Sequence, residues 1–146
     1  VKEKSTGSGD LFTCAPCKVP VRILIVDGPA PVNGGGFLSN DGFIRSLSGE
    51  KAQLDFATRV MRDLVARDVP LDILKTKISE LGGQRVFLFQ GAARSGTTIS
   101  RKTVMIAVHR NRLVTVSLHY SEGGLDDSTR RLVKTFFSSF QFLPER

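Results

Sequence analysis

Several residue types are scarce in this chain, which has no tryptophan, one tyrosine, two histidines and two cysteines. With so few aromatic rings outside the phenylalanines, nothing is interleaved with the basic residues to stack on bases, so we do not expect nucleic-acid binding. A zinc site needs four ligands, and this chain supplies four soft ligands only if all of its cysteines and histidines meet. No run approaches the roughly 20 apolar residues of a membrane helix, so the sequence predicts no transmembrane segment.

The overall composition is typical of one soluble globular domain. The 146 residues are 40% hydrophobic and 24% charged, and a chain of this length buries about 70% of its unfolded surface without needing a disulfide or a metal. The net charge of +7 favours anionic partners. The polar start VKEKSTGSGD predicts a flexible tail at 1–12, followed by a single domain at 13–146. Such a start is expected either of a trimmed chain or of an exported chain whose signal peptide has been removed.

Three segments between Gln84 and Tyr120 predict adjacent strands. Residues 85–90 are almost wholly apolar, whereas residues 102–109 and 112–120 alternate between apolar and polar. A three-residue loop at 110–112 would place His109 opposite Leu113, Val104 opposite Leu118 and His119 opposite Thr103. On the last strand, Thr115, Ser117 and His119 would then share a face with Met105, Ala107 and His109. This face is either a half-polar surface covered by a helix or the floor of a binding cleft.

The remaining segments complete an α+β fold. Strands are predicted at 19–26 and within 71–81, and a helix begins at Ser48 and is stopped by Pro70. A second helix begins at Asp126 or Asp127, and its apolar side is Leu132, Val133, Phe136, Phe137 and Phe140. A short strand closes the chain at 141–143, and irregular connections are expected at 29–42 and 91–100. We therefore predict an α/β/α sandwich with a central, mostly antiparallel sheet of about six strands flanked by two main helices.

One motif carries obvious chemistry, the Cys14-Ala-Pro-Cys17 segment. A reactive pair of this spacing sits at a helix N-terminus, but here a polar tail precedes it and a strand pattern follows. We favour a local disulfide or two ordinary thiols over redox catalysis. A zinc site in which two chains each supply both thiolates stays open as an alternative.

Two further groups are candidates for binding, and no catalytic set is recognisable. Arg94, Arg101, Lys102, Arg110 and Arg112 could meet an anion or a partner, and the loop Asn33, Gly34, Gly35 and Gly36 could reach one. The segment Gly91–Thr98 follows a strand as a phosphate loop would. It lacks the lysine and the following helix of that motif, so we interpret it as a hairpin loop.

Two segments resemble the PsbP-like superfamily: the strand-turn-strand step at 78–86, ISELGGQRV, and the C-terminal helix end at 135–142, TFFSSFQF. The resemblance covers about residues 19–142 and is one of element order. It implies an α/β/α sandwich around an antiparallel sheet, and the proteins of this superfamily mostly act as binding or accessory modules.

We therefore expect a non-enzymatic protein without a cofactor or a resident metal. It would be an exported bacterial protein, periplasmic or secreted, that binds a protein partner, for example as an inhibitor or immunity protein. A dithiol redox or zinc-binding protein acting through Cys14 and Cys17 is the alternative function. A cytoplasmic location and any oligomeric state stay open at this stage.

Overall fold

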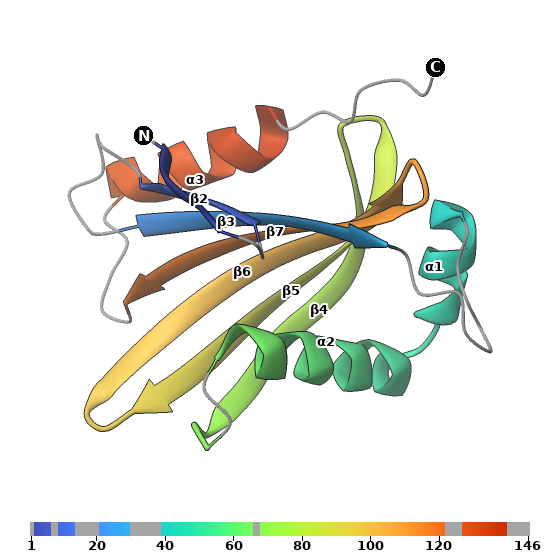
Figure 1. Cartoon of the computed structure of the whole chain (residues 1–146). Coiled ribbons are helices and arrows are strands. Elements are labelled where there is room, and N and C mark those ends of the chain that lie inside the picture. The colour runs from blue at the N-terminus through green and yellow to red at the C-terminus, as the bar shows by residue number, and fades with distance from the viewer. Residues whose placement is uncertain are drawn as a thin grey trace.

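The structure is a computed structural model and describes residues 2–6, 9–13, 21–29, 39–65, 68–121 and 127–139. The strands are β1 (Lys2–Thr6), β2 (Gly9–Thr13), β3 (Val21–Pro29), β4 (Leu71–Leu81), β5 (Gln84–Ser95), β6 (Thr98–His109) and β7 (Arg112–Ser121). The helices are α1 (Asn40–Ser46), α2 (Glu50–Leu64) and α3 (Asp127–Ser139). Figure 1 shows α2 on one side of the sheet and α3 on the other. The predicted α+β sandwich is confirmed.

The strands form one antiparallel sheet in the order β1-β2-β3-β7-β6-β5-β4. Five long strands of 9 to 12 residues make the body of this sheet, rather than the six or so that we predicted. The two short strands β1 and β2 extend it, although we expected a flexible tail there. β2 pairs with β3 from Asp10 to Thr13. Backbone pairing of this kind needs no apolar run, which is why a polar segment can form a strand.

The register predicted for the β6–β7 hairpin is wrong by one residue. The turn consists of two residues, Arg110 and Asn111, with positive φ angles of 53° and 60°, as in the tight turns that match the twist of a hairpin. His109 therefore faces Arg112, and Val104 faces Ser117 instead of Leu118. His119 lies opposite Lys102 instead of Thr103. A shift of one residue moves every cross-strand pair, and this one brings two ionisable side chains together.

The predicted loop at 91–100 is mostly strand. β5 runs on to Ser95 and β6 starts at Thr98, with a tight turn at Gly96, whose φ is 63°. At Gly91 a small residue is needed because α2 comes close to the strand. A Cβ atom on Gly91 would lie 2.8 Å from the sulfur of Met61 in α2. The small residues suggested a loop, but at Gly91 the reason for the missing side chain is the close packing of α2.

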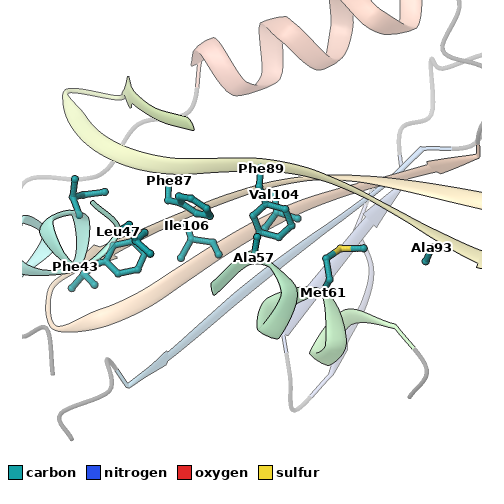
Figure 2. Packing of buried hydrophobic residues seen from close by; sticks show 11 residues of the cluster. Phe43, Leu47, Ala57, Met61, Phe87, Phe89, Ala93, Val104 and Ile106 are labelled. Atoms are coloured by element: carbon teal, nitrogen blue, oxygen red, sulfur yellow. The ribbon is translucent and has the colours of Figure 1, made fainter. Parts of the chain in front are cut away.

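The sheet is apolar on both faces and has a core layer on each. The larger layer packs β5 and β6 against α1 and α2, through Phe43 and Met61 of the helices and Phe87, Phe89 and Ile106 of the strands (Figure 2). The smaller layer packs Val86 and Met105 against Phe136 and Phe137 of α3. Alternation along β5 and β6 sends successive side chains into opposite layers, so each strand supports both.

Helix α1 was missed in the sequence, where we predicted an irregular connection from 29 to 42. The Ser39 side chain accepts a hydrogen bond from the Gly42 N–H at 3.1 Å and caps the helix. Phe43 and Ile44 of α1 are buried in the larger core layer. Helix α2 begins at Glu50 after the cap residue Gly49, not at Ser48, because the Ser48 N–H donates to the Arg45 carbonyl and closes α1 instead.

The side chain of Asn40 joins α1 to the end of the sheet. Its Nδ2 donates to the Arg85 carbonyl at 2.8 Å, and its Oδ1 accepts from the Val108 N–H at 3.0 Å. Arg85 and Val108 each lie two residues beyond Phe87 and Ile106, the last pair of the β5–β6 ladder. The amide of Asn40 thus takes the place of a backbone contact where the two strands part.

We expect Asn40→Ala to lower the free energy of unfolding by about 2 kcal/mol, because it leaves a strand N–H and a carbonyl without their partner. Urea denaturation of both proteins measures this. Asp41→Ala, at the exposed neighbouring position, is the control and should cost less than about 1 kcal/mol. Equal losses in the two variants would show that the amide bridge contributes nothing special.

Candidate functional site

A cleft of about 270 Å³ opens between α3 and the β4–β5 half of the sheet. Alternation along β4 turns Lys75, Lys77, Ser79 and Leu81 towards the α3 side. Leu88 and Gln90 of β5 lie beside them, since Lys77 pairs with Leu88 and Lys75 with Gln90. The rest of the lining includes Thr103 of β6 and Lys134, Phe137 and Ser138 of α3.

The cleft combines a positive rim with an apolar floor. Its charged lining residues are Lys75, Lys77 and Lys134, which are exposed, and no carboxylate among the described residues lines it. Leu81, Leu88 and Phe137 are half-buried and form the apolar part. Hydroxyl and amide groups of Ser79, Gln90, Thr103 and Ser138 add hydrogen-bonding capacity. Such a lining suits a ligand that is anionic and partly apolar.

A second hollow of about 390 Å³ lies towards the tip of the β5–β6 hairpin. Arg94 and Arg101, two of the predicted anion-binding residues, line it together with Asp72, Leu74 and Ile99. The register pairs Arg101 with Ala92, and Ala92 follows the cleft residue Gln90 by two positions. Both hollows therefore lie on the same face of the same strands.

The other predicted anion-binding residues are placed elsewhere. Lys102 is buried on the opposite face, while Arg110 and Arg112 lie at the far end of the β6–β7 hairpin. There Arg112 forms an ion pair with Asp27 of β3 at 2.8 Å. The structure thus joins Arg94 to Arg101 and separates both from the rest. The remaining candidates, Cys14, Cys17 and the loop from Asn33 to Gly36, lie outside the described residues.

Three polar side chains, two of them buried and the third half-buried, form a row on the α2 side of β6 and β7. Lys102 Nζ lies 2.5 Å from His119 Nδ1, and Ser117 Oγ lies 2.8 Å from His119 Nε2. Ser117 is wholly buried and Lys102 is 7% exposed. Burial lowers the pKa of Lys102. Burial, followed by the charges of Lys102 and Arg22, lowers the pKa of His119 to about 4.

This row has the wrong polarity for activating a serine. The Lys102 ammonium can only donate, so the Nδ1 atom of His119 accepts and its proton sits on Nε2. The Nε2–H group then donates to Ser117 Oγ and cannot take a proton from it, whereas a catalytic triad has a carboxylate in the place of the lysine. Ser117 is also out of reach of solvent. The row is a buried polar contact within the sheet and no active site.

The described part of the chain carries neither a metal cluster nor a membrane-spanning helix. No group of three or more metal-ligating side chains lies close enough together there to hold an ion. None of the described helices is long and apolar enough to cross a membrane.

The sheet with helices on both faces makes the chain an α/β/α sandwich (Figure 1). Two solved structures show that this fold is PsbP-like. Cyanobacterial PsbP from Synechocystis aligns with a TM-score of 0.59 and 14% identity over 95% of this chain and 74% of that one. Protein PA94 from Pseudomonas aeruginosa, whose function is unknown, aligns with a TM-score of 0.62 and 12% identity over 97% of this chain and 88% of that one. No family model and no curated protein sequence matches the chain. These similarities concern the fold.

The cleft was not found in the sequence. Lys75 and Lys77 alternate with Thr76 and Ile78 in β4, a pattern that indicates a solvated strand face. Lys134 belongs to a helix more than 50 residues later. The alternation in β4 predicts that Lys75 and Lys77 share one face. Only the tertiary fold brings Lys134 of α3 close to them.

Proposed function

We propose that this protein is a non-enzymatic binding module, exported from a bacterial cell, that holds a protein partner at the cleft beside α3. The observation that carries the proposal is the lining of the cleft: three lysines around a half-buried apolar floor. A cleft used only for packing would be filled by side chains, and a cleft used for acid–base catalysis would be lined by a histidine, a cysteine or a carboxylate. This cleft is open, and none of its described lining residues is of those types.

Site-specific photocross-linking tests the proposal. A photoreactive phenylalanine analogue at Gln90, an exposed position of the cleft, is expected to give one adduct of defined mass with a protein in cells of the source organism. The same analogue at Asp63, exposed on α2 and away from the cleft, is the matched control. Adducts of equal yield at both positions, or none at Gln90, would count against a partner at this face.

A further inference from the structure

We infer that the occupant of this face is an extended acidic segment of the partner, seated in one trough that the cleft and the second hollow form together. The trough is the α3-side surface of β4, β5 and β6 from Leu88 to Arg94. The inference rests on the proposed function and adds the chemistry of the contact.

The register places the two hollows next to each other on one face of the sheet. Gln90 of the cleft pairs with Thr103, and the next residue of β5 on the same face, Ala92, pairs with Arg101 of the second hollow. From Leu88 to Arg94 the strand advances six residues, or about 20 Å. This length is that of an extended peptide of about six residues and is longer than a small metabolite needs.

The basic side chains that line the trough indicate that its occupant is anionic. Lys75, Lys77 and Lys134 line one end of the trough and Arg94 and Arg101 the other, while Asp72 is the carboxylate among the described lining residues. Lys75 and Lys77 lie two residues apart on one strand, at a spacing of about 6.6 Å. Alternate side chains of an extended peptide repeat at the same distance, so acidic residues at every second position can meet both lysines.

Lysines on β4 also have a structural explanation. β4 is the last strand in the sheet as described, and charged side chains on an edge strand oppose pairing with further strands. That explanation covers Lys75 and Lys77 but gives no reason for Lys134, which approaches from α3 across the cleft. Nor does it account for Leu74, whose side chain is 47% exposed in the second hollow. Leu74, Leu81 and Leu88 indicate that the segment carries apolar side chains as well.

Fluorescence anisotropy with synthetic peptides tests the inference. The probe is a labelled octapeptide of alternating Glu and Leu. Octapeptides of alternating Lys and Leu, and of alternating Glu and Ser, test charge and apolar content. We expect the Glu-Leu peptide to bind at least tenfold more tightly than either, with an affinity that falls as salt rises because the exposed charges are screened.

Matched variants locate the binding. Lys75→Gln, Lys77→Gln and Lys134→Gln together should weaken binding of the Glu-Leu peptide at least tenfold. Lys51→Gln, Arg59→Gln and Arg85→Gln remove the same charge from exposed positions outside the trough and should change it less than twofold. Circular dichroism confirms that both triple variants are folded.

Two results would overturn the inference. Equal weakening in both triple variants would mean non-specific attraction to the net charge of +7. Saturable binding of octyl sulfate with no binding of the Glu-Leu peptide would assign the cleft to a small anionic amphiphile. After the first result, a photocross-link to a protein at Gln90 would still support the proposed function, so the two proposals fail separately.

Discussion

Phe87→Ala is expected to lower the free energy of unfolding by about 4 kcal/mol, as large-to-small changes of buried aromatic residues do. Phe87 is wholly buried in the larger core layer. Its ring lies 5.8 Å from that of Phe56 in α2 and 5.8 Å from that of Phe89 in the same strand. Phe56 in turn contacts Phe43 of α1 at 5.5 Å. The substitution therefore removes the strand ring that contacts an aromatic row with one ring from each of the two helices.

Guanidinium denaturation of the wild type and the variant measures this loss. Leu54→Ala, at a position of α2 that is 37% exposed, is the control and should cost less than about 1 kcal/mol. A loss below about 2 kcal/mol for Phe87→Ala would mean that the layer collapses around the cavity and that the aromatic contacts are not tightly packed. A double-mutant cycle with Phe56→Ala would then measure the coupling of the two rings, expected at about 1 kcal/mol.

The same strand links this core to the trough. Phe87 and Phe89 point into the larger core layer, whereas the alternate residues Leu88 and Gln90 line the cleft on the opposite face. When β5 loses core packing on one face, the positions of Leu88 and Gln90 on its other face are less well fixed. Phe87→Ala should accordingly weaken binding of the Glu-Leu peptide without removing any group that touches it.

The architecture was predictable because it depends on local patterns. Alternation located β6 and β7, the turn at Gly82 and Gly83 was expected from sequence, and both glycines have the positive φ that such a turn requires. The strand nature of β4 was also correctly inferred from its alternation. Each of these signals lies within about ten residues of chain and needs no knowledge of the tertiary fold.

The site was not predictable in the same way. The β6–β7 register depends on whether the turn has two residues or three, and the apolar pattern fits either, because both faces of the sheet are buried. The contact between Lys102 and His119 follows only from the two-residue turn. The cleft depends on the placement of α3 over the sheet. One local signal was available and overlooked: Ser39 followed by Asn40 and Asp41 is a helix start.

Acid should destabilise this protein through His119, in the pH range between the pKa of this side chain in the folded protein and its pKa in the unfolded chain. The side chain is neutral in the folded state, because its pKa is lowered to about 4 by burial and by the charges of Lys102 and Arg22. In the unfolded chain its pKa is the ordinary value of about 6.5. As the pH falls from 6.5 to 4, the unfolded state takes up a proton that the folded state does not. Stability therefore falls across this window and levels off below it, with a total loss of about 3 kcal/mol.

The variant His119→Gln isolates this contribution. A glutamine carbonyl can accept from Lys102 and its amide can donate to Ser117, so the buried row keeps its hydrogen bonds while losing its titration. Urea denaturation at pH 7 and at pH 4.5 should show that the wild type loses about 2.5 kcal/mol more than the variant between the two values. The carboxylates titrate in both proteins, so their effect cancels in the comparison. Parallel losses would mean that His119 is protonated in the folded state, and that its contact with Lys102 opens at low pH.

Lys102→Met tests how far the charge of Lys102 contributes to the lowered pKa of His119. Methionine fills a similar volume without a charge, but it leaves the Nδ1 atom of His119 without a donor, which should cost about 1 to 3 kcal/mol at pH 7. The variant should raise the pKa of His119 and narrow the window of acid lability, because one of the two neighbouring cations is gone. Lys102 alternates along β6 with Arg101 and Thr103, which line the trough from the other face. Protonation of His119 beside Lys102 thus places two cations against the strand that supplies Arg101 and Thr103 to the trough. The Glu-Leu peptide should protect the wild type against acid unfolding at pH values above about 4.5, where its glutamates keep their charge.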